Sequence, residues 1–325
     1  MIKSDSGTVR VAVIGLGAMA RAGQLPALAR RDDVEIVGIH SRTRKTMELV
    51  MSQYKVAAAY DSLDELIRDA SPDAAFVITP KETHAEIVTK LLRAGIHTFC
   101  EKPMATNLED ARRITELAAE VDRILMIGFN RRYAPVYQRA KEALGAAYPD
   151  VCVAQKNRPG TEYRATLENM IHMVDIVRFF MGECVDVQAH AQFEDPWYET
   201  TAAAMLRFES GAIAFILGNR SCGQWMERVE LYGGGRSIIV NCPDDVTIID
   251  HEEEHRRSMT PLRMGWATVL EKMGFQGEVD HFIECVKTRQ EPLTNAADAL
   301  KSHELMDLIL REAGLPGMGQ TEVTR

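Results

Sequence analysis

Several features that mark particular classes of protein are missing from this sequence of 325 residues. It has no apolar run of the roughly 18–20 residues that cross a bilayer, and its start, MIKSDSGTVR, lacks the apolar core of a signal peptide. It also has no long basic run, and its net charge of −9 argues against nucleic acid or an anionic membrane as the main partner. We therefore expect a cytoplasmic protein that binds a small molecule.

The six cysteines are widely spaced and form no CxxC motif. This spacing matches neither a zinc site nor the disulfide framework of a small secreted domain. We expect reduced thiols and no bound metal.

Two kinds of pattern divide the chain near residue 130. Before that point, short apolar runs typical of strands buried on both faces alternate with amphipathic helical stretches. This alternation predicts parallel crossovers and a doubly wound α/β sheet in residues 1–130. The predicted strands are 9–15, 35–40, 55–60, 74–79, 96–100 and 124–129.

After residue 130, apolar runs follow one another with glycine-containing turns and few helices between them. This pattern predicts an α+β domain over 131–325 with a mainly antiparallel, open sheet. We expect this domain to bind the substrate and to form the oligomer. We expect the ligand in the cleft between the two domains. The predicted strands are 151–158, 200–208, 212–219, 228–234 and 237–242, and the predicted helices are 165–181, 277–289 and 296–312.

A glycine-rich turn follows the first predicted strand. Gly15, Gly17 and Ala20 form a GxGxxA pattern. The first glycine permits a tight turn, the second permits close approach of a pyrophosphate, and the alanine lets the next helix pack on the strand. Such residues can serve packing alone, but their place in a βαβ unit predicts a dinucleotide-binding Rossmann domain.

The end of the second strand bears on the choice of nicotinamide cofactor. An NAD site usually has Asp or Glu there to accept hydrogen bonds from the ribose, whereas this chain reads HSRTRK at 40–45. The hydroxyl of Ser41 and the guanidinium of Arg42 suit a 2′-phosphate. The alternative is a solvated basic start to the next helix. NADP(H) is favoured, and NAD(H) stays open.

A charged turn, Glu101-Lys102-Pro103, follows a buried strand. Ligands of open α/β sheets bind beyond the carboxyl ends of the strands, so Lys102 is expected to point toward the nicotinamide. A cis Lys102–Pro103 bond would suit this turn, and Thr106 with Glu109 predicts a capping box at the next helix. The alternative is that Lys102 pairs with Glu101 or caps the sheet.

Three ionisable residues share one face of the helix predicted at 165–181. Glu168, His172 and Asp175 stand at i, i+4 and i+7, beside a more apolar face. Histidine can exchange a proton near neutral pH, and a carboxylate one turn away could orient it. The alternative is a partly buried structural histidine.

Together these motifs resemble the Gfo/Idh/MocA family of NAD(P)-dependent oxidoreductases, which includes glucose–fructose oxidoreductase and inositol dehydrogenases. The resemblance covers nearly the whole chain. Its segments are VAVIGLGAMA (11–20), ITPKETH (78–84), CEKPMA (100–105), GFNRRYAP (128–135), HMVDIVRFFMG (172–182) and GEVDHFIECVKTRQEPLTNAADAL (277–300).

The resemblance implies roles for particular residues. Lys102 would contact both substrate and nicotinamide, and His172 would handle the proton of the reacting hydroxyl. The family commonly has aspartate where this chain has Glu168, a change that moves the carboxylate by more than about 1 Å. The cofactor contacts are expected at Gly15, Gly17, Ala18, Met19, Ser41, Arg42, Thr79, Pro80, His84, Glu101 and Lys102, and the substrate contacts at Lys102, Arg131, Tyr133, Arg158, Glu168 and His172. His84 could instead cap its helix.

The implied activity is hydride transfer between a nicotinamide cofactor and a sugar, cyclitol or related hydroxyl or carbonyl compound, without a metal. A homodimer or homotetramer is expected, because an exposed antiparallel sheet often forms the subunit interface in this family. The alternatives are a nucleotide-sensing protein without turnover and a glycosidase that uses NAD for transient oxidation. A pure sensor would need neither Lys102 nor His172.

Overall fold

The computed structural model describes residues 7–146, 149–160, 164–259 and 268–320. The chain divides into two compact units. The first consists of Met1–Phe129 and Phe275–Leu300, and the second of Asn130–Gly274 and Lys301–Arg325. The predicted boundary at residue 130 puts the segment 275–300 in the second domain, whereas in the structure this segment groups with the first unit.

The first unit is built on a six-stranded sheet in the order β3-β2-β1-β4-β5-β6, in which neighbouring strands run parallel. The central strands are buried on both faces, as their continuous apolar runs require. The strands are β1 (Val9–Ile14), β2 (Val34–His40), β3 (Ala59–Tyr60), β4 (Ala74–Val77), β5 (His97–Glu101) and β6 (Leu125–Gly128). The predicted doubly wound parallel sheet is confirmed.

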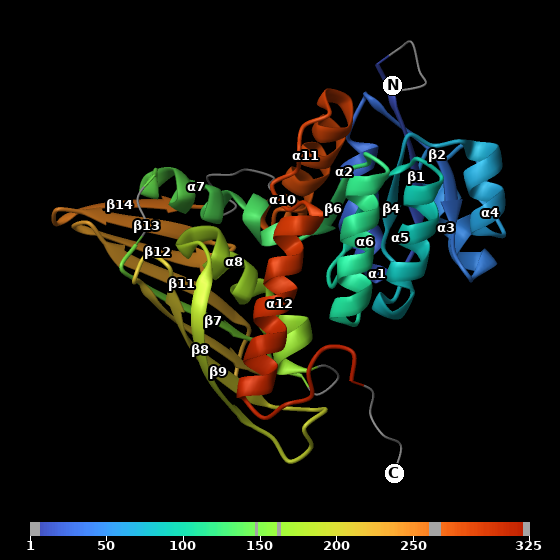
Figure 1. The fold of residues 1–325 in the computed structure, drawn as a ribbon. Coiled ribbons are helices and arrows are strands. Elements are labelled where there is room, and N and C mark those ends of the chain that lie inside the picture. Colours follow the sequence, from blue (N-terminus) through green and yellow to red (C-terminus); the bar gives the residue numbers. More distant parts are fainter. Residues whose placement is uncertain (1–6, 147–148, 161–163, 260–267, 321–325) are drawn as a thin grey trace. The chain divides into compact units, whose positions relative to one another are not determined.

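Helices cover both faces of this sheet (Figure 1). Because the strand order reverses between β1 and β4, right-handed crossovers place the helices that precede this reversal and those that follow it on opposite faces. Thus α5 and α6 pack together on one face, and α2 and α11 on the other. The helices are α1 (Ala18–Ala22), α2 (Gln24–Ala29), α3 (Arg44–Gln53), α4 (Leu63–Glu65) with a π-helix (Leu66–Ala70), α5 (His84–Arg93), α6 (Leu108–Glu120) and α11 (Phe275–Thr288).

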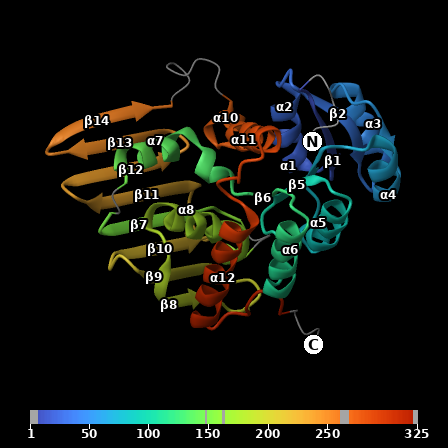
Figure 2. The ribbon, with the colours of Figure 1, turned by 45° about the horizontal axis from the view of Figure 1, so that its top comes forward.

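The second unit is built on an eight-stranded sheet in the order β14-β13-β12-β11-β7-β10-β9-β8 (Figure 2). Only β7 and β10 pair in parallel, so the expected, mainly antiparallel sheet is confirmed. The strands are β7 (Val151–Asn157), β8 (Cys184–Gln192), β9 (Thr201–Phe208), β10 (Ile213–Asn219), β11 (Met226–Gly233), β12 (Arg236–Cys242), β13 (Asp245–Asp250) and β14 (Glu253–Ser258).

Two helices pack on this second sheet. α7 contacts β12 and β13, and α8 contacts β7 and β10. This part of the chain also contains the short helix α10 and the longer helix α12. The bounds of the four helices are α7 (Pro135–Leu144), α8 (Ile171–Met181), α10 (Val269–Lys272) and α12 (Ala296–Glu312), and α8 is preceded by a π-helix (Ala165–Met170). Among the described residues, no helix is both long enough and apolar enough to cross a membrane.

The helix cap predicted after the charged turn lies one residue further along the chain. α6 begins at Leu108, and its N-cap is Asn107 rather than Thr106. The Asn107 side-chain oxygen accepts a hydrogen bond from the backbone N–H of Asp110 at 2.7 Å. Asparagine caps at least as well as threonine, so the later residue takes this position.

Candidate active site

The glycine turn after β1 requires glycine at its first position. Gly15 has φ +90°, and a Cβ there would lie 2.4 Å from the carbonyl oxygen of Ile78. Gly17 precedes α1, and a Cβ added to it would meet no protein atom within 4 Å. Its backbone is therefore open on the side where a pyrophosphate would approach. Ala18 and Met19 are exposed beside it, and this cradle fits a dinucleotide.

The predicted cofactor residues of the first unit share one edge of the parallel sheet. Gly15 follows β1, Ser41 follows β2, Thr79 comes shortly after β4, and Lys102 follows β5. The reversal of strand order between β1 and β4 falls among these ends, which is where open α/β sheets bind nucleotides. The structure thus places the predicted residues at the edge where the chemistry of this fold occurs.

Arg42 is available to a phosphate. Its side chain is exposed, and within the described residues it forms neither a hydrogen bond nor an ion pair. Arg44, in contrast, donates to Asp61 at 3.0 Å. Ser41 lies half-buried next to Arg42.

The charged turn after β5 is held by neighbouring side chains. The Lys102–Pro103 peptide bond is cis, as predicted. One Glu101 oxygen accepts a hydrogen bond from the amide of buried Gln24 at 2.5 Å, and the other accepts from the backbone N–H of Lys102 at 3.3 Å. The amide of Gln24 also reaches Glu278 of α11, at 3.4 Å. Glu101 therefore fixes the backbone from which the Lys102 side chain extends.

His84 connects this turn with the turn after β4. The ring is 1% exposed, and its Nδ1 lies 2.8 Å from the carbonyl oxygen of Pro103. Its Nε2 lies 2.9 Å from the carbonyl oxygen of Thr79. Burial lowers the pKa of His84, so the neutral ring carries one N–H and donates to one carbonyl at a time. Both nitrogens face protein carbonyls, which makes His84 a positioning residue rather than the expected cofactor contact.

In the second unit, His172 is buried on α8, with 8% of its surface exposed. Glu168 lies in the preceding π-helix, where its Oε2 accepts a hydrogen bond from the backbone N–H of Arg164 at 2.7 Å. The α-helical spacing that predicted one shared face for Glu168 and His172 is therefore interrupted. Asp175 is fully buried and accepts from Arg132 at 2.6 and 2.8 Å. Its carboxylate is committed to that guanidinium and does not serve as an open site.

Arg131, a predicted substrate contact, lies in a buried cluster of charged side chains. It is buried and donates from Nε and Nη2 to Glu227 at 2.9 and 3.1 Å. The Nζ of Lys156 and the hydroxyl of Tyr137 donate to the same carboxylate at 2.7 and 3.0 Å. This cluster is interior, which corrects the prediction for Arg131. Arg158, by contrast, is exposed directly after β7.

Burial and the charges within this cluster shift the pKa values of its members. Burial, with Arg131 as the next cause, lowers the pKa of Lys156 to about 8. Burial alone would raise the pKa of Glu227, but the two cations lower it to about 2. Sequence patterns did not find Lys156 or Glu227, because the groups that meet here are separated by 71 to 96 residues.

A second buried carboxylate fixes the start of the π-helix. Glu199 accepts from Arg164 at 2.9 Å and from the backbone N–H of Thr166 at 3.0 Å. π-helical turns are rare and are often found at functional sites. Tyr133, another predicted substrate contact, lies half-buried in a 3₁₀ turn. In the ranges that the structure describes, no group of three or more His, Cys, Asp or Glu residues is arranged to hold a metal ion.

A parallel sheet with a glycine turn at the reversal of strand order defines a Rossmann-type nucleotide-binding fold. Comparison with known proteins specifies it further. Residues 9–129 match the model of an oxidoreductase family with an NAD-binding Rossmann fold, and residues 153–239 match the GFO/IDH/MocA C-terminal domain. The chain belongs to the Gfo/Idh/MocA family of oxidoreductases.

Several relatives align over most of both chains. Myo-inositol 2-dehydrogenase of Thermotoga maritima is 29% identical, over 89% of this chain and 92% of the relative. The NAD⁺-dependent scyllo-inositol 2-dehydrogenase of Bacillus subtilis is 25% identical, over 90% of each. The crystal structure of an Agrobacterium radiobacter oxidoreductase with NAD⁺, L-tartaric acid and magnesium has a TM-score of 0.84 at 20% identity, over 94% of this chain and 96% of that one. The last likeness concerns the fold alone.

Proposed function

We propose that this protein transfers hydride between a nicotinamide cofactor and a hydroxyl or carbonyl group of a cyclitol, sugar or related compound. The main support is the Glu101-Lys102-Pro103 turn, which His84 and Glu101 hold at the same sheet edge as the glycine turn. The inositol dehydrogenases among the relatives support a substrate rich in hydroxyl groups.

The cofactor, when bound, supplies or accepts the hydride at its nicotinamide ring. The Gly15–Gly17 turn would hold its pyrophosphate. Lys102 orients and polarises the substrate oxygen with its ammonium group, on a backbone that the neighbouring hydrogen bonds keep in place. His172 accepts the hydroxyl proton during oxidation and returns it during reduction. Glu168 supports this exchange, and Tyr133 and Arg158 are candidate substrate contacts.

The experiment that tests this function is a rate measurement on a panel of cyclitols, sugars and their keto forms with each cofactor. Once a substrate is found, Lys102→Ala should lower kcat/KM by roughly 10²- to 10⁴-fold, because a positioned charge and proton-transfer partner is lost. Lys90→Ala is the matched control, since Lys90 is a half-buried lysine of α5 that pairs with exposed Asp64. A Lys102→Ala enzyme that kept most of its activity would contradict the assignment.

We further propose that NADP(H) is preferred over NAD(H), because exposed Arg42 beside Ser41 suits a 2′-phosphate. Arg42→Ala should weaken NADPH binding about 10- to 100-fold and leave NADH binding nearly unchanged. Fluorescence titration with each cofactor measures the difference. Arg44→Ala, which removes a guanidinium already bound to Asp61, should change neither affinity. Equal weakening of both cofactors by Arg42→Ala would refute the preference.

We also propose a homo-oligomer that uses the outer face of β9 and β10 in the second unit. Met205 of β9 and alternate residues of β10, namely Ile213, Phe215 and Leu217, are apolar and 36 to 47% exposed. Neighbouring Ala214 and Ile216 point the other way and are buried. A half-exposed antiparallel strand normally has polar residues on its solvent side, so a second copy of the chain is the natural cover for this face.

A further inference from the structure

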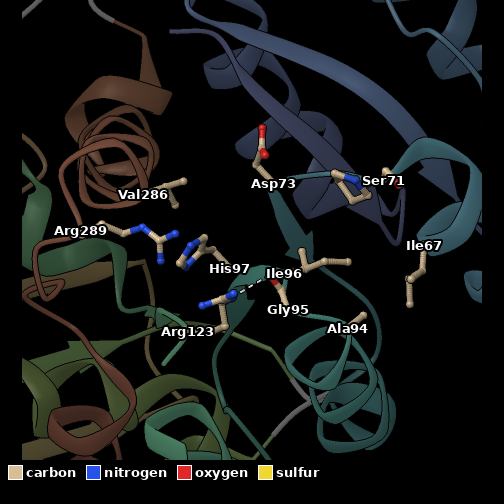
Figure 3. A pocket seen from close by; sticks show the side chains of 11 residues that line it. Ile67, Ser71, Asp73, Ala94, Gly95, Ile96, His97, Arg123, Val286 and Arg289 are labelled. Atoms are coloured by element: carbon tan, nitrogen blue, oxygen red, sulfur yellow. Dashed lines mark hydrogen bonds between the residues drawn. The ribbon is translucent and has the colours of Figure 1, made fainter. Parts of the chain in front are cut away.

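A polar cavity lies at the edge of the first unit's sheet that is opposite to the proposed nucleotide site. It has a volume of about 300 Å³ and is lined by residues just before or at the start of β4 and β5, with Arg123 and the end of α11 (Figure 3). Parallel strands start at one edge and end at the other, so this cavity is separate from the turns that follow the strand ends. Nothing in the proposed hydride transfer uses it.

The ring of His97 presents a hydrogen-bond donor to this cavity. It is the first residue of β5 and is 5% exposed. Its Nδ1 accepts a hydrogen bond from the backbone N–H of Ile124 at 3.0 Å, so the neutral ring carries its proton on Nε2. In the part of the chain that the structure describes, no protein group accepts a hydrogen bond from that N–H. That N–H is open to the cavity, so an acceptor bound there can take its hydrogen bond.

Two guanidinium groups lie beside the ring. Figure 3 shows the side chains of Arg123 and Arg289 extending toward His97 from different sides. Arg123 donates to the backbone carbonyls of Gly95 and Asp122 at 2.8 and 2.6 Å. Among the described residues, neither guanidinium forms an ion pair with a carboxylate.

The charged residues that line the cavity are Arg123, Arg289 and Asp73, so cations outnumber carboxylates there at neutral pH. Burial and then the charges of Arg289 and Arg123 lower the pKa of His97 to about 4, and the nearby carboxylate of Asp122 opposes them only weakly. The ring therefore stays neutral near pH 7. Asp73 also lines the cavity, and its carboxylate accepts a hydrogen bond from the backbone N–H of Arg10 at 3.0 Å.

Arg289 has a backbone conformation that usually belongs to glycine. Arg289 directly follows the end of α11 and has φ +61°. This left-handed position after a helix is usually glycine, because a Cβ is unfavourable there. Folding alone would favour glycine, whereas this chain places at that point a long cation that extends into the cavity.

We propose that this cavity binds a small oxyanion of the phosphate class, either inorganic phosphate or the phosphate group of a monoester. Arg123 and Arg289 supply charge-assisted hydrogen bonds, and His97 supplies a neutral N–H. Three donors that approach from β5, the segment before β6 and the end of α11 suit a tetrahedral anion better than a planar carboxylate. The site is independent of the nucleotide site and of the proposed function.

The test is isothermal titration calorimetry of the full chain with inorganic phosphate, glycerol 3-phosphate and malonate near neutral pH. Arg289→Gly should weaken phosphate binding at least about 10-fold, since one charged partner is lost. This variant should fold as well as the parent or better, because glycine suits the left-handed backbone, and its thermal unfolding checks this. Arg42→Ala, at the opposite edge of the sheet, should leave the phosphate affinity unchanged.

The outcomes separate the possibilities. Tighter binding of glycerol 3-phosphate than of phosphate supports a monoester, and the reverse supports the free ion. Absence of binding up to ~20 mM phosphate, which corresponds to a negligible affinity, would overturn the proposal. So would an affinity that Arg289→Gly leaves unchanged, one that Arg42→Ala abolishes, or malonate binding more tightly than either phosphate. Ring ¹⁵N signals of His97 should also shift on phosphate addition, and an unperturbed ring would exclude it from the site.

Discussion

At the scale of single residues, the second unit contains a buried carboxylate that accepts hydrogen bonds from three other side chains. Glu227 is 2% exposed and accepts hydrogen bonds from two cations and one phenol. Taking these charges out of water is costly, and the cluster is tolerated only because each charge finds a partner. Such a network is sensitive to the loss of any one member.

Removing the charge of Glu227 should destabilise the protein strongly. Glu227→Gln leaves Arg131 and Lys156 buried without their carboxylate, so the free energy of unfolding should fall by about 3–5 kcal/mol. Urea unfolding at neutral pH measures this change. Glu253→Gln on β14, whose side chain is 83% exposed, should change stability by less than about 0.5 kcal/mol. A second change, Lys156→Met, should restore part of the loss, because one uncompensated cation is removed. A neutral effect of Glu227→Gln alone would contradict this account.

The same residue should make the fold sensitive to acid. The pKa of Glu227 is lowered to about 2 in the folded protein and is near 4.5 in the unfolded chain. Its stabilising contribution is therefore complete above about pH 4.5 and is lost as the pH falls from there toward 2, by roughly 3 kcal/mol. Stability measured across this range should fall less steeply in Glu227→Gln than in the parent. Parallel pH profiles of the two proteins would rule out this role for Glu227.

At the scale of secondary-structure elements, the position of α11 depends on aromatic packing. Phe282 of α11 lies with its ring 5.2 Å from that of Phe76 on β4 and 5.8 Å from that of Phe99 on β5. Lys287 also pairs with Asp33 at 2.9 Å. These contacts explain why a segment far along the chain belongs to the first unit.

Shortening Phe282 should loosen this element. All three rings are fully buried, so Phe282→Ala should lower the free energy of unfolding by about 3–5 kcal/mol through lost burial and a cavity. Leu49→Ala on α3 is the control, because Leu49 is 40% exposed. Urea unfolding compares the two variants. Equal effects of both would show that α11 is not anchored by this ring.

The elements differ in how far the sequence could predict them. α12 has the predicted bounds, 296–312, and the buried strands of the first unit were found because continuous apolar runs are local signals. β14 reads EEHRRS, has no apolar periodicity and exists through its pairing with β13, so it was not predicted. The π-helix at 165–170 was also missed, because its start is fixed by Glu199 from a distant segment. The candidate site shows the same division: the motifs at the strand ends are local in the sequence, whereas the ion pairs of Arg131 and Asp175 join residues far apart in the chain and were not predicted.

At the scale of the whole molecule, the outer face of β9 and β10 sets the expected assembly. Phe215 is 47% exposed and stands opposite Met205 in the sheet register, so the two form the centre of an apolar surface. Aromatic residues at the centre of an interface often contribute most of the binding energy. The proposed homo-oligomer therefore depends most on this pair.

A charge at this point should prevent assembly without unfolding the subunit. Phe215→Glu places a carboxylate where two copies would meet and should raise the dissociation constant by more than about 100-fold, measured by sedimentation over a range of concentrations. His255→Glu on β14, at the far end of the same sheet, adds the same group at a position that is 72% exposed and should leave the assembly intact. Because the Phe215 side chain points away from α8, the folded subunit should keep its thermal unfolding temperature. A parent protein that is monomeric at all concentrations, or a Phe215→Glu variant that assembles as the parent does, would show that this face has another use.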